Sequence, residues 1–382
     1  MNKAIYFTTA QDINSSIEDL KLWKVKPNLS NQNFHNKMIR SLSLTHEVIV
    51  FSMRSINQNH TLSVLKENFV REENITWVYP EVKASKLDKF LNDNKRLSLL
   101  DKFNFKKGDV IFVDVLNIRL LKLAKAFGKK KNLKIVGICT DNPANISFVN
   151  KKYAKQVMTL SNALDGYICL TDKLDELFNK NQNKAALVID GVTEEAKSDN
   201  KVEIGKPYIF FGGSLMAKYG VRNLINAYKS LNRDDIALVI SGHHEEDNFM
   251  SYIRAFDNVI YVGALNYNEL TSFEQKALFA VNPRPIDFAI DEYSFPSKVL
   301  EYLSNGVITV TVNNPLLKEH YEDSLIFVDS GEVEDLAKGL LEALNMSEEE
   351  KKRRIKLGKS LVQANTSLAN INQKIDSLFY SE

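Results

Sequence analysis

The chain has 382 residues, of which 44% are hydrophobic and 26% are charged, and its formal net charge is +2. This composition is ordinary for a soluble globular protein, and the length suits two domains of about 150 to 200 residues each. No apolar run reaches the roughly 18 residues that a transmembrane helix needs, and the first residues turn polar too quickly for a secretory signal.

The charge is distributed unevenly along the chain. Residues 1–192 carry 30 basic and 19 acidic side chains, a net charge of +11, and the remaining residues carry −9. The basic half predicts an anionic partner, which is a membrane surface, a lipid-linked diphosphate or the acidic half of the same chain. A solvated helix end accounts equally well for the densest stretch, residues 122–134. Nucleic acid is not expected, because no aromatic and basic stacking platform accompanies the charge.

Cys139 and Cys169 each lie in an apolar run that is typical of a strand. We expect both to be buried, reduced thiols of a cytoplasmic protein, because two isolated cysteines form neither a zinc site nor a disulfide framework.

Short apolar runs alternate with helical patterns through the first half of the chain. The expected strands are residues 4–8, 48–51, 76–79, 110–113, 134–138, 166–170 and 186–189. The expected helices between them are residues 33–43, 118–127, 150–163 and 173–179. This alternation predicts a parallel sheet with helices on both faces.

A polar stretch without periodicity, residues 193–206, reads as a linker to a second alternation. There the expected strands are residues 208–211, 236–241, 258–262, 278–282, 307–312 and 326–328, with helices at 223–230 and 297–303. The predicted organisation is a first domain at 1–192, a second domain at 207–365, and a C-terminal helix at 366–382 that packs back toward the first domain. Two such doubly wound α/β domains place a ligand in a central cleft, at the carboxyl ends of the strands.

The segment Phe295-Pro296-Ser297-Lys298-Val299-Leu300-Glu301-Tyr302 predicts a helix that begins at an anion. Pro296 suits the first turn, and Ser297 and Lys298 add a hydroxyl and a cation beside the free N–H groups and the positive end of the helix dipole. Glu301 lies on the same face as Ser297, where its carboxylate can accept hydrogen bonds from ribose hydroxyls. An ordinary amphipathic helix after a Pro turn is the alternative.

A second phosphate site is predicted where a buried strand runs into Gly212-Gly213-Ser214 and then, through Lys218, into a helix from about Arg222. Glycines let backbone N–H groups approach a phosphate closely, and Lys218 adds charge. A tight strand-to-helix turn with no ligand has the same sequence pattern.

The first domain contains candidate residues for binding the hydroxyl groups of an acceptor substrate. Asp141 follows a strand, where its carboxylate could orient or deprotonate an acceptor hydroxyl, although a turn or a helix cap before Pro143 is an equal alternative. Asn31, Asn33 and His35 lie near the start of the first helix, where they could bind acceptor hydroxyls, and a simple helix cap at Ser30 or Asn31 is the alternative. No metal is expected, because the pair His243-His244 diverges in direction and no Asp-x-Asp ends a strand.

The Pro-Ser-Lys-x-x-Glu-Tyr run resembles the donor-binding segment of bacterial retaining glycosyltransferases with the GT-B fold, which build capsules, lipopolysaccharide and exopolysaccharide. The resemblance covers residues 208–341. In the first domain it is mostly limited to the order of strands and helices. It departs from the family in three places: Ser214 stands where an Arg is usual, Tyr219 where a Lys is usual, and Tyr293 where the first of two glutamates is usual. Glu292, one residue earlier, could take over that role through a loop shift, or the backbone and Tyr293 could fill it; impaired activity is the third alternative.

The resemblance implies a GT-B enzyme, two Rossmann-like domains around a cleft, that transfers a hexose from a nucleoside-diphosphate sugar to a hydroxyl of a glycan or lipid-linked oligosaccharide. It implies retention at the anomeric carbon, no metal or other cofactor, and action in the cytoplasm or at the inner face of the membrane. A non-catalytic partner subunit and a sugar-nucleotide epimerase of the same fold are the alternatives.

Overall fold

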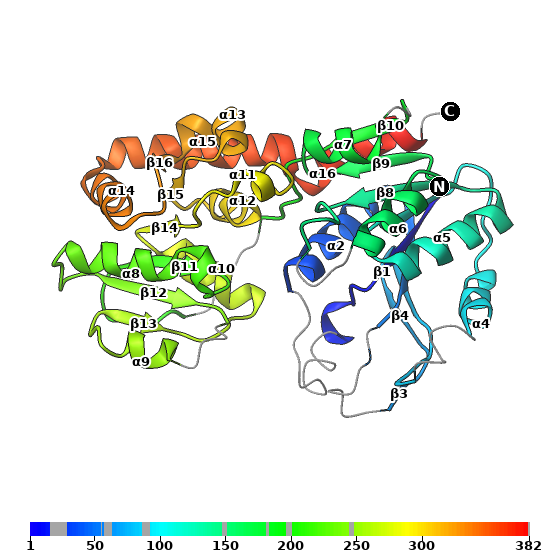
Figure 1. The fold of residues 1–382 in the computed structure, drawn as a ribbon, viewed down its shortest axis with the longest axis horizontal. Helices are drawn as coiled ribbons and strands as arrows, with labels where there is room; N and C mark the ends of the chain where they lie inside the picture. The colour runs from blue at the N-terminus through cyan, green and yellow to red at the C-terminus, as the bar shows by residue number, and fades with distance from the viewer. Residues whose placement is uncertain are drawn as a thin grey trace. The chain divides into compact units, whose positions relative to one another are not determined.

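The computed structural model describes residues 1–15, 29–54, 56, 63–85, 92–146, 151–180, 183–195, 201–243 and 248–380. The chain divides into two compact units, of which the first comprises Met1–Val192 with Thr366–Glu382 and the second Thr193–Asn365. Each unit is built on its own parallel sheet (Figure 1). The α/β fold class predicted from the alternating pattern is therefore confirmed.

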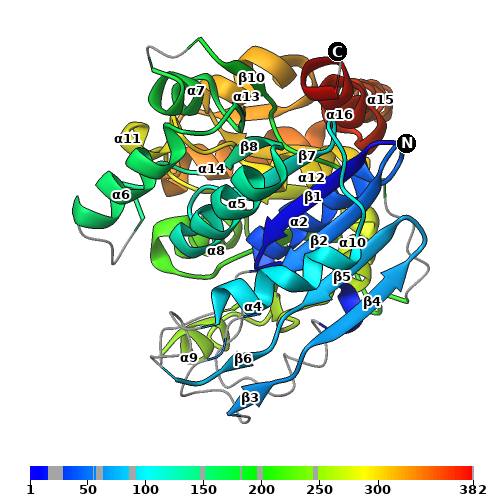
Figure 2. The ribbon, with the colours of Figure 1, turned by 90° about the vertical axis from the view of Figure 1, so that its right-hand side faces the viewer.

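The sheet of the first unit has the order β10-β9-β8-β7-β1-β2-β5-β4. Its strands are β1 (Lys3–Thr8), β2 (Glu47–Ser52), β4 (Asn68–Glu72), β5 (Ile75–Tyr79), β7 (Val110–Asp114), β8 (Lys134–Cys139), β9 (Gly166–Cys169) and β10 (Ala185–Val188). Neighbours are parallel except β4 and β5, and Figure 2 shows β1, β2, β5 and β4 side by side. The sequence pattern did not predict β4, because an edge strand that is largely exposed carries no apolar run.

Helices cover this sheet, and a short ribbon lies beside it. The described helices are α2 (Leu29–Leu42), α4 (Asp93–Leu97), η1 (Ser98–Lys102), α5 (Ile118–Lys131), α6 (Lys151–Ser161), α7 (Asp172–Phe178), α16 (Leu368–Ile375) and the π-helical turn η4 (Asp376–Tyr380). The ribbon pairs β3 (Val64–Leu65) with β6 (Val82–Lys83) in antiparallel fashion. Since α2 begins at Leu29, Ser30 and Asn31 lie inside its first turn, and the prediction that one of them caps the helix is wrong.

The most basic stretch of the first unit is the end of α5, which runs four residues beyond the predicted end of this helix. Lys130 and Lys131 both form ion pairs with Asp101, at 2.9 Å each. Hydrogen bonds from the two ammonium groups lower the pKa of the Asp101 carboxyl. Part of the predicted positive patch is therefore neutralised within the first unit.

Residues 366–380 complete the core of the first unit. Ile371, Ile375 and Phe379 are buried in the same apolar cluster as residues of β1, β7 and α2. Polar contacts fasten the segment as well: the Ser41 hydroxyl donates to the carbonyl of residue 368 at 2.7 Å, and His46 Nε2 lies 2.6 Å from Asp376 Oδ1. The first unit is thus assembled from two separate stretches of the chain.

The sheet of the second unit has the order β13-β12-β11-β14-β15-β16, and all neighbours are parallel. The strands are β11 (Tyr208–Gly212), β12 (Ala237–Ser241), β13 (Val259–Tyr261), β14 (Phe279–Asn282), β15 (Thr309–Val312) and β16 (Ile326–Val328). The helices are η2 (Ala217–Tyr219), α8 (Val221–Ser230), α9 (Phe249–Ile253), α10 (Tyr267–Lys276), α11 (Phe288–Asp291), α12 (Ser297–Ser304), α13 (Pro315–Tyr321), η3 (Glu322–Ser324), α14 (Val333–Asn345) and α15 (Glu348–Thr366).

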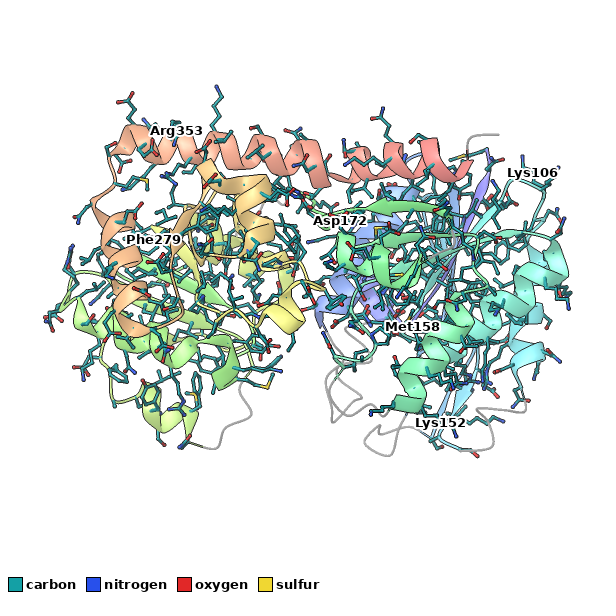
Figure 3. All side chains as sticks on the ribbon, turned by 45° about the horizontal axis from the view of Figure 1, so that its top comes forward. Lys106, Lys152, Met158, Asp172, Phe279 and Arg353 are labelled. Carbon is teal, nitrogen blue, oxygen red and sulfur yellow. The ribbon has the colours of Figure 1, made fainter. Side chains whose placement is uncertain are left out.

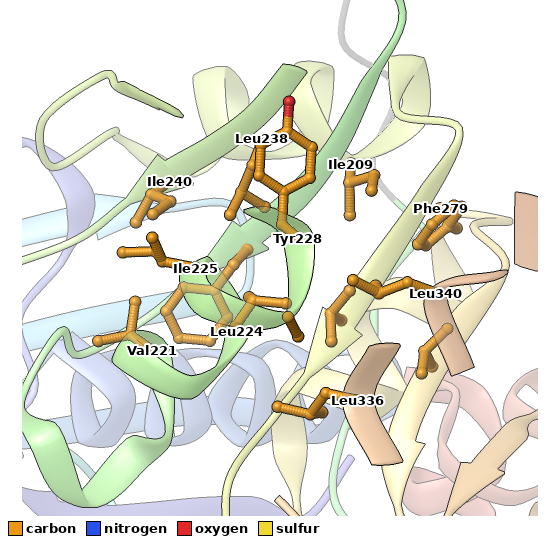
Figure 4. Packing of buried hydrophobic residues seen from close by; sticks show 14 of the residues in the cluster. Ile209, Val221, Leu224, Ile225, Tyr228, Leu238, Ile240, Phe279, Leu336 and Leu340 are labelled. Carbon is orange, nitrogen blue, oxygen red and sulfur yellow. The ribbon is translucent and has the colours of Figure 1, made fainter. Parts of the chain in front are cut away.

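Alternate side chains of β11 enter two separate cores. Ile209 and Phe211 pack with α8, α9 and α14 on one face of the sheet, where Leu224 and Leu340 are fully buried (Figure 4). Tyr208 and Phe210 pack on the other face with residues of α10 and α12. The period of two along a buried strand accounts for this division, and it holds α12 against the sheet beside the end of β11.

Candidate functional site

The order of the second sheet defines a switch point between β11 and β14. Strands β12 and β13 follow β11 on one side, whereas β14, β15 and β16 follow on the other. In open parallel sheets, ligands bind outside the carboxyl ends of the strands at such a point. β11 ends at Gly212 and is followed by Gly213, and β14 is followed by Pro283.

The glycine-rich segment after β11 turns tightly toward α8. The Gly213 N–H donates to the carbonyl of Ser241 at 2.9 Å, and a single 3-10 turn, Ala217–Tyr219, leads to Gly220. Gly220 has φ of 75°, and a Cβ built there would stand 2.2 Å from the Pro283 oxygen. Only glycine is free of both the backbone strain and this clash, so the turn brings the ends of β11 and β14 into contact.

Lys298, in the first turn of α12, lies directly over Gly213. A Cβ built on Gly213 would be 2.7 Å from Lys298 Cε, so the missing side chain leaves room for the lysine. Ser297 beside it is exposed, and Pro296 stands at the N-cap rather than in the first turn, where its lack of an N–H is equally harmless. Two predicted phosphate-binding segments, far apart in sequence, are therefore brought together at the switch point.

A buried tyrosine fixes α12 to the end of β11. The Gly212 N–H donates to the Tyr302 hydroxyl at 3.1 Å, and Tyr302 is 1% exposed. Burial raises the pKa of this phenol well above its usual value, with a smaller contribution from Glu274, so it remains neutral and able to donate. Glu301, the residue before it, is half-buried and lies one turn after Ser297 on α12.

Ser214 is half-buried in the glycine-rich segment, and Lys218 is exposed with its Nζ 5.2 Å from the Tyr219 ring centroid. Lys218 therefore lies beside its neighbour's ring on the turn that leads to α8.

The loop between β14 and α12 contains an ion pair that the sequence pattern did not reveal. Arg284 Nη2 donates to Asp291 Oδ1 at 2.5 Å, and Asp291 Oδ2 accepts from the N–H of Asp287 at 2.8 Å. Asp291 is buried, whereas Glu292 is exposed and Tyr293 is half-buried in the turn that follows α11. A charged residue between Pro283 and Pro285 at a strand end was the available signal for Arg284.

The acceptor-side candidates lie in different environments within the first unit. Asp141 follows β8 and is half-buried, with its Oδ1 accepting from the Asn142 N–H at 2.7 Å. Asn31 and Asn33 are half-buried on α2. His35 is fully buried, and its Nδ1 lies 2.7 Å from the Tyr6 hydroxyl. Its burial suits a residue that packs α2 against the middle of the sheet more than one that touches an acceptor.

Among the described residues, no group of three or more His, Cys, Asp or Glu side chains is arranged to hold a metal ion. The predicted divergence of the pair at His243 is not visible, because residues 244–247 lie outside the described part of the chain.

One family model matches most of the second unit. Residues 192–360 match the family model described as glycosyl transferases group 1. The second unit is therefore similar to this family along most of its length. Its match includes both segments that meet at the switch point, around Gly213 and around Lys298. No curated protein sequence matches the chain.

Solved structures with similar folds cover both units. Sucrose-phosphate synthase from Thermosynechococcus elongatus aligns over 98% of each chain, with 12% identity and a TM-score of 0.70. The trehalose 6-phosphate synthase from Burkholderia multivorans aligns over 99% of this chain and 96% of its own, with 12% identity and a TM-score of 0.64. An E. coli trehalose-6-phosphate structure bound with UDP-2-fluoro glucose covers 98% of each chain, at 11% identity and a TM-score of 0.66. These likenesses establish the GT-B fold, two Rossmann-like domains, for this chain.

Proposed function

We propose that the protein transfers a hexose from a nucleoside-diphosphate sugar to a hydroxyl group of a glycan or a lipid-linked oligosaccharide. The observation that carries this proposal is the position of Lys298 over Gly213, at the switch point of a unit that is similar to the group 1 glycosyl transferases. A cation, a helix N-terminus and a closely approached backbone there form a site for the diphosphate.

The donor is assigned to the second unit. In this proposal Ser297 and Lys298 bind the diphosphate, and Glu301 accepts hydrogen bonds from the ribose hydroxyls. Gly213 and Ser214 flank the phosphates, and Gly213 contributes the space that its missing side chain leaves, because its N–H is bonded to Ser241. Stabilising the nucleoside diphosphate as it leaves is then the main catalytic contribution, because negative charge develops on that group in the transition state.

Further donor contacts come from two neighbouring segments. Lys218 adds positive charge from the turn before α8. Glu292 and Tyr293 face the transferred sugar from the turn after α11, and Glu292 takes the role that a glutamate at position 293 would have. The helix dipole, the backbone N–H groups and the lysines carry the diphosphate charge, so the proposed reaction needs no metal.

The acceptor is assigned to the first unit. Asp141, at the carboxyl end of β8, would orient or deprotonate the attacking hydroxyl, and Asn31 and Asn33 would bind other hydroxyls of the acceptor. His35, on the same helix as Asn31 and Asn33, would act through its contact with Tyr6 of β1. Transfer with retention at the anomeric carbon and a role in cell-surface polysaccharide synthesis complete the proposal.

A lipid-linked acceptor would bring the protein to the inner face of the membrane. Exposed lysines such as Lys106 and Lys152 on the first unit support this part of the proposal (Figure 3), because anionic lipid attracts basic surfaces. Within the described residues, no helix has the length and apolarity to cross a bilayer.

The test begins with nucleotide binding measured by calorimetry. UDP, GDP, dTDP, CMP and their common sugars are titrated into the wild type, starting with UDP-glucose because one neighbour is bound with a UDP-glucose analogue. The same titrations use Glu301→Ala and, as the matched control, Glu342→Ala, which removes an exposed carboxylate from α14. We expect one nucleotide to bind, and to lose affinity in Glu301→Ala alone.

A turnover assay distinguishes the transferase from the epimerase. Release of the nucleoside diphosphate that depends on an added glycan acceptor supports the transferase, whereas interconversion of the sugar nucleotide without an acceptor supports the epimerase. A wild-type protein that binds no nucleotide at millimolar concentration refutes the transferase and leaves the partner subunit as the better proposal.

A further inference from the structure

Arg284 lies in a segment whose backbone is restrained by two prolines and by close contacts with two glycines. It lies between Pro283 and Pro285, whose rings fix φ near −65°. The Pro283 oxygen is approached from both sides by glycines, since Cβ atoms built on Gly220 and Gly331 would stand 2.2 and 2.9 Å from it. The backbone at Arg284 is therefore restrained before any ligand binds, and a ligand need not order this segment.

Asp291 orients the guanidinium without enclosing it. The carboxylate is 8% exposed and receives both Arg284 Nη2 and the Asp287 N–H, so its charge is compensated. The Arg284 side chain is 31% exposed. One edge of the guanidinium is thus committed to Asp291, and its other N–H groups remain for a ligand, because a guanidinium carries donors along more than one edge.

These two side chains line an open hollow at the ends of β14 and β15. The hollow is shallow and open to solvent, with a cavity volume of about 10 Å³, and it is lined by Asn282, Arg284, Ile286, Asp291, Pro296, Val312 and Asn314. Pro296 is the N-cap of α12, so the hollow adjoins the helix start at which the phosphate site is proposed.

Two positively charged side chains lie close to the ring of Tyr219, on the turn before α8. The Arg284 guanidinium carbon lies 5.8 Å from the Tyr219 ring centroid, and Lys218 Nζ lies 5.2 Å from the same centroid. Both cations are within the range of attraction to the ring face. Asp291 neutralises only one of them, which leaves an excess of positive charge that suits a ligand with more than one negative charge.

We propose that Arg284 binds the diphosphate of the nucleotide sugar, as a cation of the donor site in addition to Lys298. This inference rests on the proposed function. A planar guanidinium can donate two parallel hydrogen bonds to the oxygens of one phosphate, which a lysine cannot do, and this geometry fixes the orientation of the leaving group. Asp291 is a positioning residue that holds the guanidinium for this contact.

The test compares ligands that differ only in phosphate number. The nucleoside diphosphate that the wild type binds most tightly is titrated alongside its monophosphate and its nucleoside. The proteins are wild type, Arg284→Gln and Arg233→Gln. Arg233 is the matched control, because it forms an exposed pair with Asp235 in the loop before β12, at the amino ends of the strands. A double variant, Arg284→Gln with Asp291→Asn, avoids leaving a buried carboxylate without its cation.

We expect both Arg284 variants to lose about tenfold or more in affinity for the diphosphate, as for a lost charge-assisted hydrogen bond, and to bind the nucleoside as the wild type does. The control should match the wild type throughout. Equal losses for all three ligands, or no loss, overturn the inference while the proposed function stands. A wild type that binds no nucleotide overturns both.

Discussion

Replacing Gly213 with alanine should weaken nucleotide binding and leave the fold intact. The new Cβ would stand 2.7 Å from Lys298 Cε, closer than the ordinary contact range of 3.4 to 4 Å, so the end of the lysine has to move away. A side chain displaced from its rotamer costs about 0.5–1.5 kcal/mol. The alanine restores about 0.4–1 kcal/mol by restricting the unfolded chain. The free energy of unfolding should therefore change little.

The main effect of Gly213→Ala should be a lower affinity for the nucleotide. A hydrogen bond to a charged group contributes about 1.5–3 kcal/mol, and its removal weakens binding about 10- to 150-fold. Calorimetry with the best nucleoside diphosphate measures this change, and urea unfolding measures the stability. In a double-mutant cycle, Gly213→Ala should have little further effect on Lys298→Gln, because the displaced group is already absent.

Two results would refute this reasoning. One is undiminished affinity in Gly213→Ala, and the other is full additivity with Lys298→Gln. Gly242→Ala provides the contrast, since its Cβ would lie 1.6 Å from the Gly213 oxygen at φ of 145°. A backbone atom cannot move aside as a lysine can, so Gly242→Ala should unfold the second unit.

Two further outcomes can be measured on the protein without ligand. Tyr302→Phe removes the acceptor of the buried Gly212 N–H and should lower the free energy of unfolding by about 1–3 kcal/mol in urea titrations; an unchanged midpoint would contradict the proposed anchor. Burial, with a hydrogen bond to Cys169, raises the pKa of the Cys139 thiol well above its usual value, so the neutral form persists at pH 8. Because both thiols are also buried, both should be inert to Ellman's reagent until the chain is denatured, and rapid reaction of the folded protein would show that the strands open.

The elements that the sequence predicted well are those with strong periodicity. Strands such as β1 and β12 are buried on both faces, and a continuous apolar run marks them whatever they pack against. The edge strand β4 escaped prediction because it is held by pairing with β5 while its side chains stay largely exposed. β4 ends at Glu72 and β5 begins at Ile75, so the two form a short hairpin in which only β5 carries an apolar pattern.

In the candidate site too, the sequence predicts some residues but not the contacts between them. Lys298 could be predicted because a helix start with a cation has a local signature, and Gly213 because a glycine pair follows a buried strand. Their contact across 85 positions follows only from the sheet order, which sets β11 beside β14. The pair of Arg284 with Asp291 depends on a loop conformation that carries no periodicity, so only the three-dimensional structure reveals it.

The first unit is interrupted by the second, because residues 366–382 close a core that residues 1–192 begin. A ribosome therefore completes the whole second unit before it delivers Ile371, Ile375 and Phe379 to the sheet they cover. The second unit can fold as a continuous segment during synthesis, while the first must wait with one apolar face uncovered. A chaperone that binds this face would act on the nascent chain, and a premature stop near residue 365 would leave the face permanently exposed to aggregation.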